Sequence, residues 1–446
     1  MYFTKYFFLH ELDKEYYILI NTLSRESLLL NHEQFEMIFE TIVDVDKLPQ
    51  NLYVCLKEKH FIYSDIDKEF QLENDIRQRA NSEIFSLPLI FGICLTYNCN
   101  SKCIYCYEND VNRDTKVLSE KDIKMIFHTI ETIIENNLQR KIHIFLEGGE
   151  PFMLGVKNEL SFIFDSIREL KRRKKNVTFF SFTNGQTTLE YFNLIEQNKD
   201  IIDDFLVTII GDKILHNYYR PSTINKDSYY CVVNTVDRLV RSGVNVKIVL
   251  NIDRNNIHGV SHIKELIKQK EWDSYPNFHN IHMSRIRYFR TNNRDIDESD
   301  VICSLDKNIL NDQFIDWSDF KLYKNAKDCV SPLTASFHCR YSCTANEFRQ
   351  FLFGPCGYIY SCTKVTGKPQ YAIGRYTPKL IFYQNNIEIW KRYNIENIEK
   401  CKKCKFIFLC GGGCFLETEY DLAGNYIPKC PNVEKMLNII CNNLKK

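Results

Sequence analysis

From residue 88 to about residue 287, short apolar runs alternate with longer amphipathic stretches. This alternation is typical of βα units, in which parallel strands form a sheet and helices cover it. Strands are expected over residues 89–96, 142–146, 177–182, 205–210, 244–252 and 281–288. Helices are expected near residues 120–136, 160–173, 189–197, 229–242 and 258–270. Six such units fit a partial barrel or a doubly wound sheet, and both gather reactive groups at the carboxyl ends of the strands.

The two flanking regions have a different pattern. Residues 1–85 predict a small α+β module, with a hairpin and two helices over residues 16–21, 26–30, 33–41 and 52–59. After about residue 300 the βα rhythm is lost, and most of the cysteines lie there among turn-forming Gly and Pro. We therefore predict three domains, over residues 1–85, 86–300 and 301–446.

Cysteine is the unusual component of the composition, with 18 in 446 residues. Charge is balanced, with 58 Lys+Arg against 57 Asp+Glu, so nothing points to nucleic acid or a membrane surface as a partner. The first residues lack the pattern of a secretion signal, and the longest apolar run, residues 87–95, is too short to cross a bilayer. We expect a cytoplasmic protein, where clustered cysteines bind metals or do redox chemistry more often than they form disulfides.

Three of these cysteines, Cys99, Cys103 and Cys106, follow the first expected strand within eight residues. Three thiolates bind three irons of a [4Fe–4S] cluster and leave the fourth iron open, much as a catalytic zinc keeps one open position. On spacing alone, a zinc site with a fourth ligand elsewhere and reduced surface cysteines are the alternatives.

The spacing Cys99-x3-Cys103-x2-Cys106, with Tyr105 before the last cysteine, resembles the signature of the radical S-adenosylmethionine (SAM) superfamily. The resemblance implies a partial (β/α)6 TIM-type barrel and a [4Fe–4S] cluster on these cysteines, whose open iron is chelated by SAM. It further implies that one-electron reduction cleaves SAM to methionine and a 5′-deoxyadenosyl radical that abstracts hydrogen. The cofactors carry this chemistry, and the protein excludes water and positions the hydrogen donor.

Motifs after the second and third expected strands extend the resemblance. The stretch Glu147-Gly148-Gly149-Glu150-Pro151 resembles the family's Gly-Gly-Glu-Pro motif, where the glycines allow close backbone approach and the carboxylate of Glu150 holds the SAM ammonium. Thr183-Asn184-Gly185 stands at the position of a second family motif. Each motif alone would be read as a turn.

Later residues complete the set of SAM contacts that the resemblance implies. Thr208 follows the fourth strand, Arg220 is the candidate for the SAM carboxylate, and Asn251 ends the fifth strand. Arg220 also fits a plain ion pair. Ile210 replaces the Asp usual in the family and Asp212 follows two places later, which leaves a ribose or substrate role for this carboxylate open.

Seven further cysteines recur as Cys343-x13-Gly357-x4-Cys362, Cys401-x2-Cys404-x5-Cys410-x3-Cys414 and Cys430. The pattern resembles the SPASM domain, a C-terminal extension of many radical SAM enzymes that act on peptides and proteins. The resemblance implies two auxiliary [4Fe–4S] clusters, one on Cys343, Cys362 and Cys414 and the other on Cys401, Cys404, Cys410 and Cys430. Cys339 is the expected eighth ligand, with Cys329, Cys356 or an open iron as alternatives. Zinc, which Cys-x2-Cys pairs also bind, is the alternative metal.

The N-terminal region indicates the kind of substrate. Residues 17–23 and 27–30 resemble the region before the barrel in maturases of ribosomally made peptides, where a winged-helix-like module captures a leader peptide by β-addition. The alternative is that residues 1–85 only cap the barrel.

We therefore predict a radical SAM/SPASM enzyme that forms a thioether or carbon–carbon crosslink in a precursor peptide or protein, with electrons from a flavodoxin- or ferredoxin-type donor. One alternative is formylglycine formation of the anaerobic sulfatase-maturating type, for which the sequence reveals no base. An alternative of another class is a non-catalytic iron–sulfur electron carrier or zinc scaffold.

Overall fold

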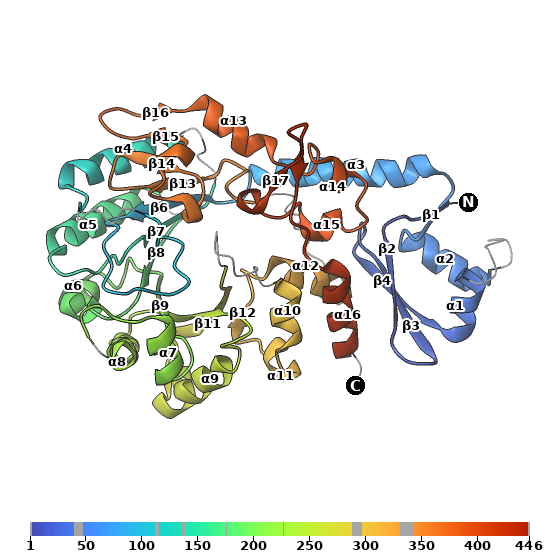
Figure 1. Ribbon diagram of the computed structural model, residues 1–446, viewed down its shortest axis with the longest axis horizontal. Helices are drawn as coiled ribbons and strands as arrows, with labels where there is room; N and C mark the ends of the chain where they lie inside the picture. The colour runs from blue at the N-terminus through green and yellow to red at the C-terminus, as the bar shows by residue number, and fades with distance from the viewer. Residues whose placement is uncertain are drawn as a thin grey trace.

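The expected strands pair in parallel, in chain order, within one curved sheet in the computed structural model of the chain (Figure 1). They are β6 (Leu89–Cys94), β7 (Ile142–Glu147), β8 (Val177–Thr183), β9 (Asp204–Thr208), β10 (Val246–Ile252) and β11 (Phe278–Arg285). The structure describes residues 2–39, 48–111, 116–135, 137, 140–174, 176–225, 227–287, 297–330 and 343–444. The prediction of an α/β partial barrel is confirmed.

Helices cover the outer, convex side of this sheet (Figure 1). They are α4 (Glu120–Glu135), α5 (Lys157–Arg173), the 3-10 turn η2 (Thr188–Tyr191) with α6 (Phe192–Gln197), α7 (Lys213–Tyr219), α8 (Ser228–Arg241), α9 (Gly259–Lys270) and the 3-10 turn η3 (Trp272–Ser274). Their apolar stripes, such as Ile123, Ile126 and Ile130 of α4, are fully buried. Helix α7 is too short for its periodicity to be recognised in the sequence.

The sheet continues at both ends into the C-terminal third of the chain. Strand β12 (Ile315–Asp316) pairs with β11, and β13 (Gln350–Phe353) pairs in parallel with β6. The antiparallel strands β14 (Tyr358–Tyr360), β15 (Gly374–Arg375) and β16 (Ile381–Phe382) follow β13. These short strands were not predicted. They attach the cysteine-rich segment directly to the edge of the barrel, where the rings of Phe91 and Phe351 stack at 5.7 Å.

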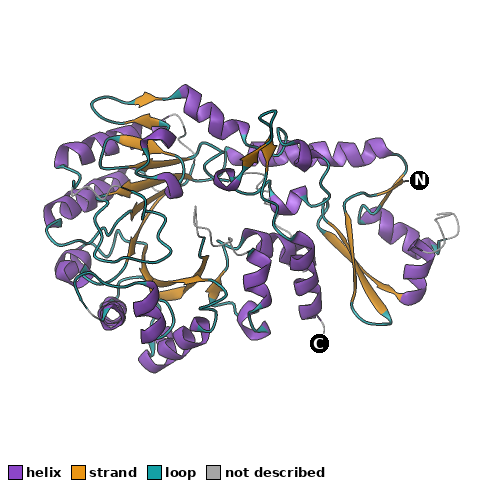
Figure 2. Cartoon of the chain, viewed as in Figure 1, coloured by secondary structure: helices purple, strands orange, loops and turns teal. Residues whose placement is uncertain are grey.

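Short helices and turns make up the rest of the C-terminal region (Figure 2). They are α10 (Glu298–Cys303), α11 (Lys307–Leu310), α12 (Lys321–Val330), η4 (Thr363–Val365), η5 (Pro369–Tyr371), α13 (Gln384–Arg392), α14 (Glu399–Lys402), α15 (Ile407–Cys410), η6 (Phe415–Glu417), the hairpin β17 (Glu419–Tyr420) and β18 (Tyr426–Ile427), and α16 (Val433–Leu444). Five of the seven cysteines of the expected SPASM pattern lie in the connections between these elements, namely Cys343, Cys362, Cys404, Cys414 and Cys430.

The N-terminal module has its own small core. The expected hairpin is β3 (Tyr16–Asn21) and β4 (Glu26–Asn31), and β2 (Phe7–Glu11) adds a third antiparallel strand. Strand β1 (Tyr2–Phe3) pairs with β5 (Ile62–Tyr63), and α1 (His32–Phe39) and α2 (Gln50–Glu58) match the expected helices over their described residues. The sheet and helices bury Leu19, Leu30, Leu56 and Phe61 completely.

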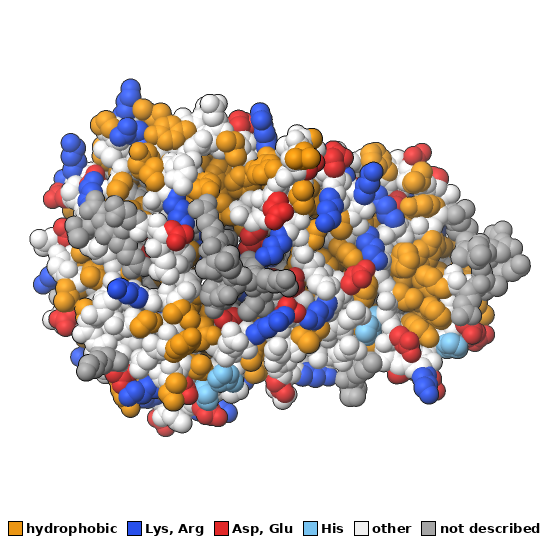
Figure 3. All heavy atoms as spheres, in the orientation of Figure 1, with side chains coloured by type: hydrophobic (Ala, Val, Ile, Leu, Met, Phe, Trp, Pro, Cys, Tyr) orange, Lys and Arg blue, Asp and Glu red, His pale blue; other side chains and the backbone are white. Residues whose placement is uncertain are grey.

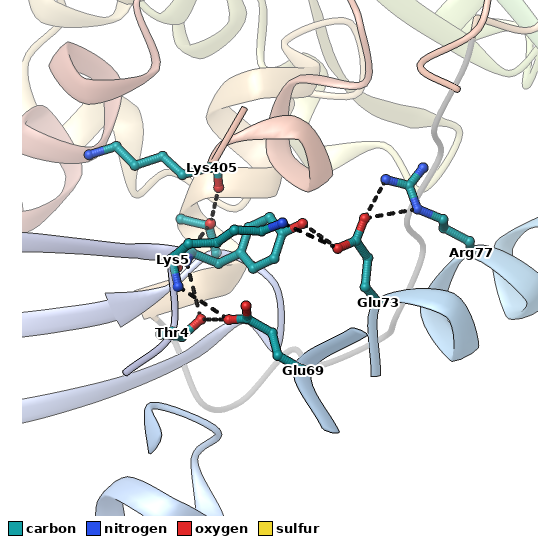
Figure 4. Close-up of polar contacts among 8 residues, drawn as sticks. Thr4, Lys5, Glu69, Glu73, Arg77 and Lys405 are labelled. Carbon is teal, nitrogen blue, oxygen red and sulfur yellow. Dashed lines mark hydrogen bonds and ion pairs between the residues drawn. The ribbon is translucent and has the colours of Figure 1, made fainter. Parts of the chain in front are cut away.

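Helix α3 (Ile66–Ile84) runs from this module along the C-terminal region (Figure 1) and was not predicted. Two of its four buried residues are Glu69 and Glu73, so the apolar periodicity that marks a helix is interrupted. Both carboxylates accept hydrogen bonds from the short segment between β1 and β2 (Figure 4). Glu69 accepts from the Thr4 hydroxyl and from the Lys5 N–H at 3.2 Å, and Glu73 accepts from the Tyr6 hydroxyl at 2.6 Å.

The N-terminal module is joined to the segment between Cys401 and Cys410. The Thr22 hydroxyl donates to the Lys405 carbonyl (Figure 4), and the Arg25 guanidinium donates to the Phe408 carbonyl at 3.3 Å. The Phe408 ring lies 5.5 Å from the Tyr6 ring and 5.3 Å from the Arg77 guanidinium. The two ends of the chain therefore share one packed boundary.

Charged side chains of both signs are intermixed on the face seen in Figure 3 rather than gathered by sign. None of the helices in the described ranges combines the length and the hydropathy that a bilayer-crossing segment needs.

Replacing Arg77 by Met should destabilise the protein by about 2 kcal/mol, because it leaves the buried Glu73 carboxylate without its 2.7 Å partner. Burial raises the pKa of Glu73, but the bonds from Tyr6 and Arg77 outweigh it and hold the pKa below its ordinary 4.5. The stabilisation is therefore complete at neutral pH and is lost as the pH falls through this lowered pKa. Urea unfolding at several pH values measures it, with R79M on the exposed face of α3 as the control. Equal losses in both variants would contradict the account.

Candidate functional site

The cysteine loop after β6 is held by backbone pairing with the segment that follows α7. Lys102 N–H donates to the Pro221 carbonyl at 2.9 Å, and Ile104 N–H donates to the Tyr219 carbonyl at 3.1 Å. Thr223 N–H donates back to the Asn100 carbonyl at 2.8 Å. This antiparallel pairing fixes Cys99, Cys103 and Cys106 at the carboxyl end of the barrel, beside Arg220.

Glu150 and Asn184 meet at the same end, from the loops after β7 and β8. One Glu150 oxygen accepts from the Thr183 hydroxyl at 2.7 Å, and the other accepts from Asn184 N–H at 2.7 Å. The Asn184 amide donates to the Asn100 side chain at 2.6 Å and lies 3.7 Å from the Cys99 sulfur. Burial raises the pKa of Glu150, while these bonds and Arg220 oppose the rise. The structure therefore brings the two motifs to the first cysteine.

Arg220, Tyr105 and Asn251 form a second group beside the loop. The Tyr105 hydroxyl accepts from the Arg220 guanidinium at 2.7 Å and from the Asn251 amide at 3.3 Å. Burial disfavours the charge on Arg220, but Cys103, Tyr105 and Cys99 outweigh burial and raise its pKa. The Arg220 Nε has no hydrogen-bond partner among the described residues. A buried cation with one free donor, next to the cysteines, suits an anionic group such as a carboxylate.

Two glycines allow the loop after β7 to approach the cysteine loop. A Cβ on Gly149, whose φ is +47°, would lie 2.2 Å from the Asn98 carbonyl oxygen, and one on Gly148 would lie 2.2 Å from the Cys94 sulfur. Glu150 N–H donates to the same Asn98 carbonyl at 2.8 Å. Any side chain at position 149 would separate Glu150 from the cysteines.

The other residues in this region have plainer positions. Thr208 is buried at the end of β9, and no hydrogen bond joins its side chain to this group within the described ranges. Asp212 accepts from Leu215 N–H at 2.9 Å as the N-cap of α7, which accounts for its carboxylate without a ligand.

Three thiols on one fixed loop, with a free guanidinium donor and a buried carboxylate beside them, fit a [4Fe–4S] cluster that carries an amino-acid ligand. In the described part of the chain no three His, Cys, Asp or Glu side chains converge as around a single metal ion. The cysteines of a cluster each bind a different iron, so their sulfurs are spread around it.

The C-terminal thiols form two sets. Burial, together with the neighbouring thiols of Cys343 and Cys414, raises the pKa of Cys362 to about 12. In the second set burial and the neighbouring thiols raise the pKa of Cys401 to about 12, and these thiols are those of Cys410, Cys430 and Cys404. Buried thiols that oppose one another's ionisation become thiolates together only around a cation, so each set suits a metal cluster.

Three glycines follow a cysteine of the second thiol set and turn backbone N–H groups toward its sulfur. The residues after Cys410 are Gly411, Gly412 and Gly413, all with positive φ. The N–H groups of Gly412 and Gly413 bond to the Cys410 sulfur and favour its thiolate, although burial raises its pKa to about 11. This is the turn toward sulfur that ligand-flanking glycines allow.

The eighth ligand stays a prediction. Cys339 lies outside the described residues. Cys329 is buried in α12, within 3.5 Å of the Asn325 carbonyl. Cys356 is exposed in the turn after β13 and faces Cys94 and Tyr97.

Several polar residues near the site were not singled out from the sequence. Glu108 accepts from Gly149 N–H at 2.8 Å, and Lys364 lies 4.3 Å from the Tyr107 ring. Glu147 is buried beside them. The only signal in the sequence was position: Tyr107 and Glu108 directly follow Cys106, Glu147 begins the glycine motif, and Lys364 follows Cys362 by two residues.

Comparison with known proteins identifies the family. Residues 93–267 match the radical SAM superfamily. A cysteine-type anaerobic sulfatase-maturating enzyme of Clostridium novyi (strain NT) is 24% identical over 362 residues, which cover 78% of this chain and 91% of that protein. The chain therefore carries a radical SAM domain, as its cysteine spacing predicted, and SAM and [4Fe–4S] clusters are the cofactors of this class.

Solved structures show the same fold beyond the barrel. "Native anSMEcpe with bound AdoMet" matches with a TM-score of 0.58 and 18% identity, over 80% of this chain and 95% of that one. Streptococcus suis SuiB bound to S-adenosylmethionine matches with a TM-score of 0.54 and 15% identity, over 93% of this chain and 96% of that one. SuiB bound to precursor peptide SuiA matches with a TM-score of 0.50 and 14% identity. These spans exceed the barrel and confirm the expected SPASM-type architecture.

Replacing Gly149 by Ala should weaken SAM binding by about tenfold or more, a loss of about 1.4 kcal/mol, because the added Cβ displaces Glu150. Gly155→Ala is the matched control, since Gly155 also has positive φ but has no atom within 4 Å of the added Cβ. Equilibrium dialysis of the reconstituted variants with labelled SAM measures the difference, and iron content checks that the cluster is retained. Equal affinity in the two variants would exclude the proposed approach of Glu150 to SAM.

Proposed function

We propose that this protein reductively cleaves SAM and uses the resulting radical to modify a ribosomally made peptide, forming a thioether or carbon–carbon crosslink. The observation that carries the proposal is the convergence of Cys99, Glu150 and Arg220 at the carboxyl end of the barrel. Cys343 and Cys362 of the first C-terminal thiol set flank strands that join the barrel sheet. The two thiol sets support oxidative chemistry on a macromolecular substrate.

The residues have distinct roles in this proposal. Cys99, Cys103 and Cys106 would hold the cluster, which supplies the electron that cleaves SAM when both are bound. Glu150 would accept hydrogen bonds from the SAM ammonium, and Arg220, whose Nε has no partner among the described residues, would bind the SAM carboxylate. Tyr105 and Asn251 hold Arg220 in place, and Thr183 and Asn184 orient Glu150. Thr208 lines the same end of the barrel.

The auxiliary clusters are assigned to the two thiol sets. Cys343, Cys362 and Cys414 would hold one, with Cys339 as its further ligand, and Cys401, Cys404, Cys410 and Cys430 would hold the other. A protein of the flavodoxin or ferredoxin type would supply electrons from outside. The proposed barrel domain begins at about residue 86, and the proposed auxiliary-cluster domain begins at about residue 301.

The N-terminal module supports a peptide substrate. Strand β4 pairs only with β3 in the described sheet, so it is an edge strand, and edge strands are the ones to which a peptide strand can add. SuiB, solved with a precursor peptide, matches 93% of this chain, whereas anSMEcpe matches 80%. The wider match favours a peptide maturase with such a module.

The second candidate is oxidation of a Cys or Ser side chain to formylglycine. Its support is the similarity in sequence to cysteine-type anaerobic sulfatase-maturating enzymes. The product separates the two candidates, because a crosslink removes two hydrogens between two residues whereas formylglycine changes one residue.

Anaerobically reconstituted protein with dithionite and SAM should form 5′-deoxyadenosine, and Cys103→Ala should abolish this cleavage because the cluster loses one of its three thiolates. Liquid chromatography of the quenched mixture measures the product. Cys303→Ala is the control and should cleave SAM like the wild type, because Cys303 is exposed and belongs neither to the cysteine loop nor to the C-terminal thiol sets. Wild-type protein that leaves SAM intact would overturn the proposed function.

Iron analysis should give about eleven to twelve irons per chain for three clusters. Cys362→Ala and Cys404→Ala should each lower the count by about four irons, and the double variant by about eight, because the two thiols belong to separate sets. Zinc in place of iron at these positions, or loss of all C-terminal irons in either single variant, would contradict two separate auxiliary clusters.

A further inference from the structure

Glu147 is a buried carboxylate to which the proposed cofactor binding gives no role. It ends β7 and pairs in register with Cys94 of β6. Its neighbours Ile144 and Leu146 are completely buried in the core under the helices, so the alternation of the strand turns Glu147 to the inner side of the barrel. Only 6% of Glu147 is exposed, and its Oε1 has no hydrogen-bond partner among the described residues.

A glycine makes room for this carboxylate. Gly92 lies on the inner face of β6, and a Cβ there would come within 2.9 Å of Glu147 Oε1 and 2.5 Å of a Leu352 methyl group. The space is therefore occupied by the carboxylate because β6 has no side chain at that point. A buried carboxylate oxygen without a hydrogen-bond partner among the described residues costs free energy, which a bound substrate that hydrogen-bonds to it would recover.

Glu147 also lies between the loop that carries Cys99, Cys103 and Cys106 and the first C-terminal thiol set, Cys343, Cys362 and Cys414. It interacts electrostatically with Tyr107 and Glu108, which follow Cys106. From the other side it interacts with Lys364, which follows Cys362 of the first C-terminal set. A substrate that reacts with a radical formed at the Cys99–Cys106 loop has to lie near that loop. If it also passes an electron to a cluster on the first C-terminal thiol set, it has to lie between the two.

We propose that the Glu147 carboxylate takes up the proton that the substrate loses when its new bond forms; this inference rests on the proposed function. The substrate gives one hydrogen atom from a C–H bond to the 5′-deoxyadenosyl radical. A second group, S–H, N–H, O–H or C–H, gives its proton to Glu147, and the new bond forms between the two centres. The remaining electron leaves to a one-electron acceptor of the iron–sulfur class. The same proton is lost from S–H or O–H in formylglycine formation, so the role holds for either product.

The charges around Glu147 suit this role. Burial and Glu108 raise its pKa to about 8, and Lys364 opposes the rise. Tyr107 and Cys94 also face it, and burial raises the pKa of both well above neutrality, so both are neutral. A raised pKa makes the carboxylate a stronger base than an exposed Glu, and ionisation above about pH 8 makes it ready to accept the proton. Product formation should therefore rise with pH up to this range.

Glu147→Gln tests the proposal, because it keeps the shape of the side chain and removes the base. The probes are the Kp18Cys peptide, named in a solved anSMEcpe complex, and peptides encoded by short reading frames next to this gene. With a peptide that the wild type converts, Glu147→Gln should still form 5′-deoxyadenosine within about twofold and still take deuterium from the labelled substrate. Product should fall by about 10²- to 10⁴-fold. Glu147→Asp should restore part of the activity.

His143→Gln is the matched control, on the same face of β7 four residues earlier and bonded to Thr178. It should form product at the wild-type rate. Infrared difference spectra of the holoenzyme, with and without peptide, provide a readout independent of turnover. The carboxylic acid band that disappears as the pH is raised through about 8 should be absent in Glu147→Gln.

The outcomes are distinct. Wild-type protein that converts no probe peptide contradicts the proposed function, and this inference falls with it. Wild-type turnover with normal product formation by Glu147→Gln overturns the inference alone. Loss of 5′-deoxyadenosine together with product in Glu147→Gln also overturns it, because it would place Glu147 in SAM binding instead.

Discussion

The pairing of the cysteine loop with residues 219–223 is the interaction on which the site depends. Three backbone hydrogen bonds hold the two segments side by side, so Arg220 is placed against the loop by the main chain rather than by its own side chain. The guanidinium then bonds to Tyr105, and Tyr105 in turn reaches Asn251. Because strands in a parallel sheet end at one edge, Glu150 and Asn184 arrive at the same place. The positions of five side chains thus follow from one sheet and one short stretch of pairing.

Two kinds of electrostatic environment divide the chemistry within this frame. At the loop that carries Cys99, Cys103 and Cys106, the buried Arg220 guanidinium lies beside the thiols, and its Nε has no hydrogen-bond partner among the described residues. In the two C-terminal thiol sets the thiols raise one another's pKa. They become thiolates together only around a positively charged metal cluster. Between the cysteine loop and these sets, burial and Glu108 raise the pKa of Glu147 to about 8. A radical reaction that also releases a proton and an electron would use all three of these environments.

The barrel could be predicted because its strands are continuous apolar runs with typical β-sheet composition, and its site because the cysteine spacing and the glycine motif are local in sequence. Helix α3 could not, because buried Glu69 and Glu73 break its apolar pattern, and the hydroxyl groups that bond to them, of Thr4 and Tyr6, lie more than sixty residues away in the sequence. Strands β13 to β16 are two to four residues long, and the first of them pairs with the distant β6, so no local pattern marks them. Glu147 has a role only through neighbours from distant segments.

Electron–nuclear double resonance of the reduced, reconstituted protein with SAM labelled with ¹⁵N at its amino group tests the central claim most directly. If Cys99, Cys103 and Cys106 hold a cluster with an open iron, the electron spin on that cluster should couple to the labelled nitrogen, and the coupling should disappear in Glu150→Ala and Arg220→Ala. A reduced cluster signal that shows no coupling to SAM in the wild-type protein would contradict the account.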